Sequence, residues 1–349
     1  MLKAAGVSAQ DDGVKVSSSD DKPGAHSDLI AMLQLLAVEQ ANAPSSTSSD
    51  HEIEMTREAS GRHLAQLMAM INNGSLGLSY PKPNEGGSAN SEYWKVLGLS
   101  FRLVPGKSAS RALRVFLEGP TTCDCNIAIV ALQLDTFRAL VGNSQFDAQF
   151  GAEGETDRYE SDYLSFNVVG SWRVSLARMT GNQGEQSGFG GSVDWFLEPS
   201  HGSENTHPER EAQIGDWWYC ANHPGYLVRH PGGYWSGENA LCVDIDSEGT
   251  RYWQGFGVAK LTSAQMAKEL AGAYNAPSTV PPSAEAPASV TAEEIEASMF
   301  YADDMEARGL RIDFAKAARL RDGEVSGVRR KPKPLTPEQL AQFQAILDH

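Results

Sequence analysis

The spacing of apolar residues changes along the chain, and each spacing predicts a different element. Residues 26–43 and 55–74 carry apolar side chains at helical intervals, and the second stretch ends in Asn-Asn-Gly, a signal for the end of a helix. Residues 93–106 and 111–119 are short stretches rich in β-branched and aromatic side chains and bounded by Gly and Pro. That composition predicts two strands.

The most apolar stretch is 127–142, which leaves almost no polar face. A helix that is apolar all round is buried, so we expect this one at the centre of a domain. Thr122 and Asp124 stand where N-cap residues belong. Cys123 and Cys125 therefore lie at the mouth of a buried helix.

The second half of the chain is dominated by turns and aromatic residues. Residues 151–212 are polar and rich in glycine, which predicts loops with one or two short strands, inserted around a site. Residues 240–246 and 251–258 are expected to be antiparallel strands. A helix follows, because Thr262 and Gln265 have the spacing of a capping box.

Changes in composition divide the chain of 349 residues. Two further capping-box pairs, Thr291 with Glu294 and Thr336 with Gln339, predict helices near 292–307 and 337–347. The run before them is rich in Pro, Ala and Ser, which predicts an extended linker. The expected parts are a low-complexity start with two helices (1–79), a compact domain (80–275), the linker (276–290) and a helical C-terminal tail (291–349).

Charge and hydropathy limit the classes of partner. A net charge of −16 argues against nucleic-acid binding, which needs a basic face. Residues 308–333 hold nine Lys or Arg against three acidic residues, which indicates either a solvated helix and tail or a docking segment for an acidic partner. No run approaches the roughly 18 apolar residues of a membrane span. With no secretory signal and four cysteines, we expect a cytoplasmic protein.

A catalytic thiol is one interpretation of the two cysteines at the helix N-terminus. A thiol at a helix N-terminus is favoured as thiolate, and the same N–H groups hold an oxyanion. Cys125, at the first turn, is better placed than Cys123. The proton acceptors available are the carboxylates of Asp124 and Glu238, or imidazoles.

Other readings of these residues stay open at this point. Free cysteines are most often core residues. His223 and His230 precede prolines in turn-rich loops, and this context favours a turn or surface role over a catalytic one for both. The cluster Trp217, Trp218 and Trp235 fits packing as well as a substrate platform. A zinc site would combine Cys123, Cys125, Cys220 or Cys242 with His223, although a C-x-C spacing fits zinc poorly.

Several motifs together resemble a known family. "TTCDCNIAIV", "GD" at 215–216, "YWSGENALCVDI" and "RYWQGFGVA" are similar to motifs of the bacterial protein-glutamine γ-glutamyltransferases, or transglutaminases, of the spore-coat type. The resemblance places Cys125 on the nucleophile, Asp124 on the acidic residue before it, and Glu238 on the carboxylate partner of the thiol. Phe146 and Phe150 fall on two aromatic residues that follow. It covers 121–150 and 214–275, about a quarter of the chain.

The resemblance also carries expectations about fold and substrate contacts. It implies an α+β, papain-like (NlpC/P60-like) core, with a Cys-bearing helix packed on an antiparallel sheet and helical flanks. Trp235, Asn239 and Gln254 would bind substrate, with Gln254 standing where the family has His. Asp124 replaces the family's Glu, which shortens the side chain by one methylene.

The activity implied by the resemblance is acyl transfer through a Cys thioester. A protein Gln would be the donor, and a Lys amine, or water in deamidation, the acceptor. No cofactor is implied, and no EF-hand-like loop suggests calcium. The partners expected are proteins bearing Gln and Lys, with no nucleic acid or membrane. The acidic start and the capped C-terminal helices are also compatible with a protein that is passed to a chaperone or a secretion system. The alternative is a non-catalytic interaction protein on the same fold, or a zinc-binding module.

Overall fold

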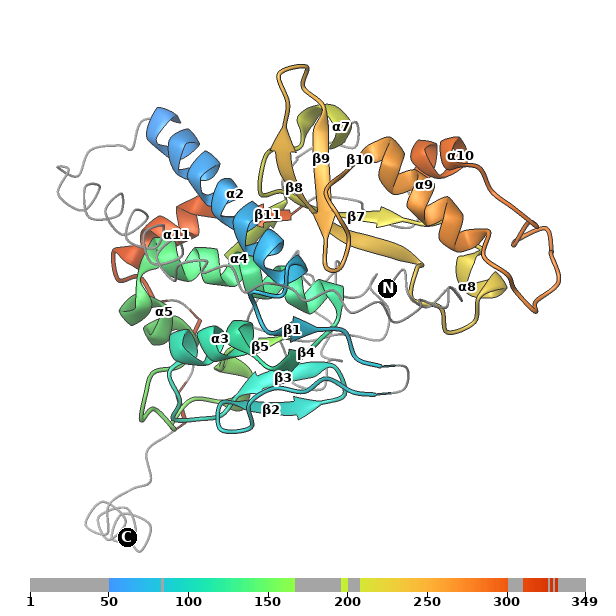
Figure 1. The fold of residues 1–349 in the computed structure, drawn as a ribbon. Helices are drawn as coiled ribbons and strands as arrows, with labels where there is room; N and C mark the ends of the chain where they lie inside the picture. The colour runs from blue at the N-terminus through green and yellow to red at the C-terminus, as the bar shows by residue number, and fades with distance from the viewer. Residues whose placement is uncertain are drawn as a thin grey trace, which may run out of the picture.

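The structure is a computed structural model that describes residues 50–82, 85–166, 196–199, 208–300, 310–325, 327–328 and 330–331. Helices and antiparallel strands are mixed within it, as the α+β expectation requires. Figure 1 shows α4 (Cys125–Val141) near the centre, with α2 (Asp50–Asn72) above it and the sheet of β2, β3 and β5 below. The Cys-bearing helix packs against an antiparallel sheet through β8. This coarse arrangement is confirmed, and the papain-like detail of the core stays a prediction.

The larger sheet of the described residues has six strands in the order β10-β9-β8-β7-β11-β6, all antiparallel. The strands predicted at 240–246 and 251–258 correspond to β8 and β9, and a bulge lies between Cys242 and Asp244. The bounds are β6 (Leu197–Pro199), β7 (Trp217–Ala221), β8 (Gly237–Ile245), β9 (Arg251–Gly255), β10 (Leu261–Thr262) and β11 (Leu310–Ile312).

A smaller sheet lies on the other side of α4. The strand predicted at 93–106 is a hairpin of two strands, β2 (Trp94–Leu97) and β3 (Ser100–Leu103), and β5 (Ser165–Phe166) pairs with β3. β1 (Leu78–Ser79) and β4 (Thr121–Thr122) form a separate parallel pair. β5 and β6 fall within 151–212, so the short strands expected there are confirmed for its described part.

The prediction of a strand at 111–119 is wrong, because this stretch is the helix α3 (Ala109–Glu118). Its buried side chains recur at helical spacing, and Ser108 caps the first turn by accepting a hydrogen bond from the N–H of Arg111. Val115 and Phe116 suggested a strand by type. The spacing of the buried positions was the stronger signal.

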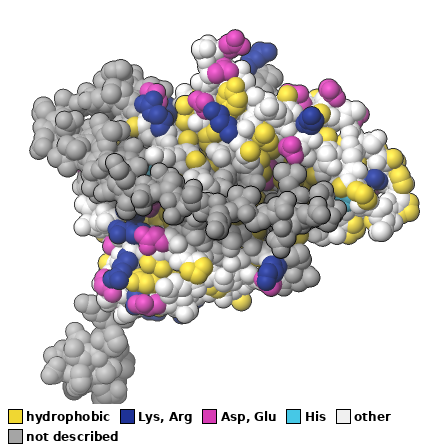
Figure 2. Space-filling view, viewed as in Figure 1, with side chains coloured by type: hydrophobic (Ala, Val, Ile, Leu, Met, Phe, Trp, Pro, Cys, Tyr) yellow, Lys and Arg dark blue, Asp and Glu magenta, His cyan; other side chains and the backbone are white. Residues whose placement is uncertain are grey.

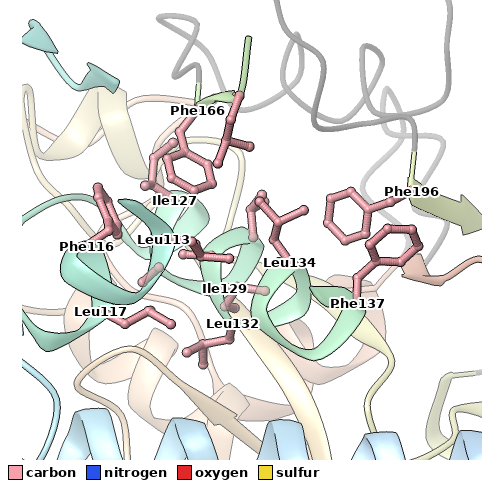
Figure 3. Packing of buried hydrophobic residues seen from close by; sticks show 14 of the residues in the cluster. Leu113, Phe116, Leu117, Ile127, Ile129, Leu132, Leu134, Phe137, Phe166 and Phe196 are labelled. Atoms are coloured by element: carbon pink, nitrogen blue, oxygen red, sulfur yellow. The ribbon is translucent and has the colours of Figure 1, made fainter. Parts of the chain in front are cut away.

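Helix α4 is buried on nearly every side, as predicted. In Figure 3 its side chain Ile129 lies near Leu113 of α3, and Phe137 lies beside Phe196. Helices α2, α3, α5 (Asn143–Phe150) and α11 (Phe314–Arg321) also pack against it. This burial fixes the position of the α4 N-terminus within the core.

Helix α2 confirms the helix predicted at 55–74, and it packs on α4 and β8. A Cβ at Gly61 would lie 2.2 Å from the backbone oxygen of Ile214, so glycine permits this close approach. Ile214 precedes the "GD" turn, where Gly215 has a positive φ of 95°. The conformation of this turn therefore allows α2 to pack closely on the sheet. The helix predicted at 26–43 lies outside the described residues.

A second core cluster lies under α9 (Ser263–Tyr274) and α10 (Ala292–Ser298). Trp218 and Trp253 of the sheet contact Phe300 in it. Both helices carry the predicted capping boxes, at Thr262/Gln265 and Thr291/Glu294. The third predicted box, at Thr336/Gln339, lies outside the described residues. The remaining short helices are α7 (Pro208–Glu211), α8 (Tyr226–Arg229) and the 3-10 turn η2 (Glu160–Asp162).

The residues after the linker take part in the sheet. Residues 276–290 have no helix or strand, yet Tyr274 donates to the oxygen of Pro287, and Asn275 bonds both backbone groups of Val290. After them β11 pairs with β6 and β7, and α11 packs on α4. The strand β11 corrects the expectation of a purely helical tail. How the chain divides into folding units stays a prediction.

A chain that ends at residue 289 is expected to lose its cooperative fold. The deletion removes Ile295, Met299 and Phe300, which are fully buried against the sheet, and Leu310 and Leu320 from the main core. Each buried apolar side chain contributes roughly 1.5–3 kcal/mol, so the summed loss is comparable to the whole stability of a domain. Urea unfolding followed by circular dichroism measures this.

The matched control ends at Lys331 and keeps every described residue. It is expected to unfold at the same urea concentration as the full chain. A chain ending at 289 that unfolds with an unchanged midpoint would show that the core does not need the strand and the two helices.

The described surface carries charges of both signs. Figure 2 shows Lys and Arg side chains interspersed with Asp and Glu over the described part of this face. Among the described helices, none is both long and apolar enough to cross a membrane.

Candidate active site

The N-terminus of α4 presents Cys125 as the first residue of the helix. Asp124 is the N-cap, and its side chain accepts a hydrogen bond of 2.8 Å from the N–H of Ile127. The preceding residue, Cys123, is fully buried in the core, and its N–H donates to the oxygen of Ser79. Cys125 is only partly buried. Of the two thiols, the structure therefore presents Cys125 at the site and uses Cys123 for packing.

Strand β8 brings Asn239 against the thiol. The Nδ2 of Asn239 lies 3.3 Å from Cys125 Sγ, and the Nε1 of Trp217 donates to Asn239 Oδ1 at 3.0 Å. An indole N–H only donates, so the atom that it meets must be the amide oxygen. The amide N–H₂ therefore has to face the sulfur. Trp217 thus fixes the orientation of a donor aimed at Cys125.

Glu238 is a buried carboxylate beside the same thiol. The residue is 5% exposed, and the backbone N–H of Phe256 favours the charged form of its carboxylate. Its Oε1 has no hydrogen-bond partner among the described residues. A Cβ at Gly255 would lie 2.1 Å from Oε1, so the carboxylate occupies space that glycine leaves open.

Burial and charge raise the pKa of both partners. Burial first, then the negative charges of Glu238 and Asp124, raise the pKa of the Cys125 thiol, and hydrogen bonds from Asn239 partly offset this. Burial raises the pKa of Glu238 well above its usual range. Burial and the two carboxylates thus outweigh the helix terminus, which was expected to favour the thiolate. The site rests as a neutral thiol beside a carboxyl group of raised basicity, which suits proton sharing.

Asp124 titrates differently from Glu238. Burial raises its pKa from 3.8 to about 6, and the N–H groups of Ile127 and Asn126 hold it below a still higher value. The folded protein therefore keeps a proton on Asp124 that the unfolded chain releases between those values. The free energy of unfolding should fall as the pH rises through this window.

Asp124→Asn is expected to flatten this part of the stability profile, because Asn caps a helix about as well as Asp and does not titrate. Chemical unfolding at pH values from 4 to 7 measures it. Activity should fall less than in a Glu238 variant. An unchanged slope of stability against pH would show that Asp124 titrates alike in both states.

The other two residues expected at the site are not hydrogen-bonded to the thiol among the described residues. Trp235 packs on the second cluster, and its backbone contacts are with Tyr226 and Asn222. Gln254 pairs with Leu241 across β8 and β9, which puts it on the same sheet face as Asn239.

The two histidines considered as bases are held on the α8 and α9 side. His223 accepts a hydrogen bond at Nδ1 from the N–H of Gly225, and His230 Nε2 lies 2.7 Å from the oxygen of Tyr274. Burial lowers the pKa of His223. These contacts favour the turn role over a catalytic one for both.

Two tyrosines near the thiol were not found from the sequence. Tyr80 follows β1, and Tyr219 lies on β7 opposite Asn239. Burial and then the charges of Glu238 and Cys125 raise the pKa of Tyr80, and burial and then Cys125 and Glu238 raise that of Tyr219. Neither lies in a stretch whose pattern marks it. The position of Tyr80 depends on the β1–β4 pairing, which brings residues 78–79 beside the start of α4.

The zinc alternative gains no support from the described residues. No group of three or more His, Cys, Asp or Glu side chains within them could hold a metal ion. All four cysteines are free thiols.

Comparison with known proteins shows a distant likeness to a solved structure. No protein-family model matches the chain, and no curated protein matches it. A solved structure titled "Transglutaminase from Geobacillus stearothermophilus (without C-terminal extension)" is similar at 15% sequence identity and a TM-score of 0.45. The likeness covers 79% of this chain and 98% of that chain. The chemistry of the site has to be inferred from its own side chains.

Proposed function

We propose that this chain is a thiol acyltransferase of the transglutaminase kind, with Cys125 as nucleophile and Glu238 as its proton partner. The observation that carries the proposal is the pairing of a helix-terminal thiol with a buried carboxylate and an oriented amide donor. A nucleophile, a base and an oxyanion donor within one site are the parts that acyl transfer requires. The motif resemblance around Cys125 and Glu238 supports the same assignment.

The first half-reaction forms a thioester. As Cys125 Sγ attacks the side-chain carbonyl carbon of a protein Gln, Glu238 takes the thiol proton. Asn239 Nδ2 and the backbone N–H of Cys125, at the start of α4, stabilise the oxyanion. When the tetrahedral species collapses, the C–N bond breaks. Glu238 returns its proton, and ammonia leaves.

The second half-reaction transfers the acyl group. A Lys amine attacks the thioester carbonyl, Glu238 takes a proton from the attacking nitrogen, and the C–S bond breaks. Glu238 then reprotonates the Cys125 sulfur, and an isopeptide bond remains. Attack by water gives Glu by the same steps. The partners in this proposal are proteins that bear accessible Gln and Lys.

Incorporation of a fluorescent alkylamine into casein tests the proposal, with ammonia release measured in parallel. The proposal expects both, in equal amounts when water is excluded. Ammonia without incorporation would assign deamidation to the site. Neither product, together with equal iodoacetamide labelling of all four cysteines, would favour the non-catalytic interaction protein.

The pH–rate profile should lack an imidazole limb. The titrating unit is the coupled Cys125–Glu238 pair with Asp124 beside it, so the limbs belong to the cluster. Gln254→Ala should lower the rate without moving the optimum, and Gln254→His should keep activity. His223→Ala and His230→Ala should leave the shape unchanged. Loss of a limb near pH 6.5, the usual imidazole pKa, in either His variant would contradict the carboxylate mechanism.

A further inference from the structure

The carboxylate of Glu238 is held by a turn, residues 255–258, that follows β9. Gly255 in this turn leaves the space that Oε1 fills, and the N–H of the next residue, Phe256, favours the charged form of the carboxylate. The depth and direction of the carboxylate therefore depend on the backbone of these four residues. A shift of this turn would move the proton acceptor relative to Cys125.

Asn72, the last residue of α2, hydrogen-bonds to this turn through both polar atoms of its side chain. Its Nδ2 donates to the oxygens of Gly255 and Val258, both at 3.0 Å. Its Oδ1 accepts from the N–H of Gly257 at 2.8 Å. The turn is thus held in place by a residue of α2, which lies outside the sheet and more than 180 positions away in the sequence.

Tyr80 holds the same turn at Phe256. Its hydroxyl donates to the Phe256 oxygen at 2.7 Å, and the two rings stack with centroids 4.3 Å apart. The N–H of Phe256 points to Glu238 and its oxygen to Tyr80, so the residue is fixed at both ends. Burial and the nearby charges raise the pKa of Tyr80, which keeps its hydroxyl protonated as a donor.

We propose that Asn72 and Tyr80 are positioning residues of the reaction, which hold turn 255–258 so that the backbone of Gly255 and Phe256 keeps its place against the Glu238 carboxylate. The inference rests on the proposed function, in which that carboxylate exchanges the proton of Cys125. Neither residue acts on substrate in this account.

The pH profile follows from the groups that face Glu238. These are Cys125 of α4, Tyr80 and Tyr219, with Asp124 beside Cys125, and none of them is a cation. The backbone N–H of Phe256 favours the ionised carboxylate against the cost of burial. A loosened turn moves this N–H away from the carboxylate, so the apparent pKa of the cluster rises. The acid limb of the rate profile should then move to higher pH.

The test compares Tyr80→Phe and Asn72→Ser with Tyr274→Phe. Tyr274 is the matched control, because it is another buried tyrosine whose hydroxyl donates to a backbone oxygen, that of Pro287 in the second cluster. For Tyr80→Phe and Asn72→Ser we expect kcat/KM to fall roughly three- to thirtyfold, the scale of one or two hydrogen bonds. The acid limb should move up by about half to one pH unit, and the control should show no such movement.

Alkylation of Cys125 by iodoacetamide at each pH reads the same cluster without turnover. Its pH dependence should shift in the same direction in both variants, so this inference is tested even if casein is not a substrate. A reduced rate with the limb in its wild-type place, in two folded variants, would make both residues merely structural and overturn the proposal. Wild-type rates and profiles in both variants would overturn it equally. Either result leaves the assignments of Cys125 and Glu238 standing.

Discussion

Cys125→Ala is expected to abolish amine incorporation and ammonia release, by about 10⁴-fold or more, while the protein stays folded. The sulfur forms the bond to the acyl group, and no other described thiol replaces it, because Cys123, Cys220 and Cys242 are buried. Cys125 is partly exposed at the start of α4, so its loss leaves only a small gap in packing. Steady-state rates and a thermal melt measure the two effects separately.

Cys123→Ala is the matched control for this result. It removes a sulfur two residues away, from a fully buried position in the main core. We expect a loss of stability on the order of 1 kcal/mol and retention of most of the activity. If Cys123→Ala were inactive and Cys125→Ala active, the alignment of the motif on this chain would be wrong by two residues.

Glu238→Gln is expected to lower kcat/KM by a factor on the order of 10² or more, the scale for a lost acid–base group. Gln keeps the size of the side chain in the space beside Gly255, but it cannot take the thiol proton. Since burial raises the pKa of Glu238, the wild type loses stability as the pH rises through that value. The variant should therefore melt no lower than the wild type at pH 8.

The pattern of loss separates catalysis from folding for Glu238. A variant with low activity and an unchanged or higher melting temperature fits a catalytic carboxylate. Asp124→Asn provides the comparison, because it also removes a carboxylate beside Cys125 and keeps the N-cap. Full activity in the double variant would remove carboxylates from the mechanism and return attention to the histidines.

The sequence predicted the local features of the fold better than its long-range ones. Helix α4 was predictable because an apolar run with an Asp cap has one common solution. Helix α3 was missed because residue types were weighed above the spacing of buried positions. Strand β11 was missed because it is short and its pairing with β6 and β7 joins segments far apart in sequence. Such pairings leave no local pattern.

The same difference between local and long-range features applies to the candidate site. Asp124 and Cys125 lie together on one helix, and Glu238 and Asn239 are neighbours in one motif, so the sequence places each pair. That Asn239 meets the thiol, while Trp235 does not, depends on how β8 crosses the end of α4. Asn72 and Tyr80 reach the site through α2 and through the β1–β4 pair. Only tertiary packing brings them to turn 255–258.

The most direct measurement is mass spectrometry of the protein after a short incubation with a Gln-containing peptide and no amine, quenched in acid. We expect an adduct equal to the peptide less one ammonia, on the fragment that contains Cys125. The Cys123→Ala variant should carry the same adduct, which assigns it to the other thiol of that fragment. The adduct should disappear when an alkylamine is added before the quench. Ammonia release with no adduct on Cys125, or an adduct that survives in Cys125→Ala, would contradict the thioester and with it the proposed function.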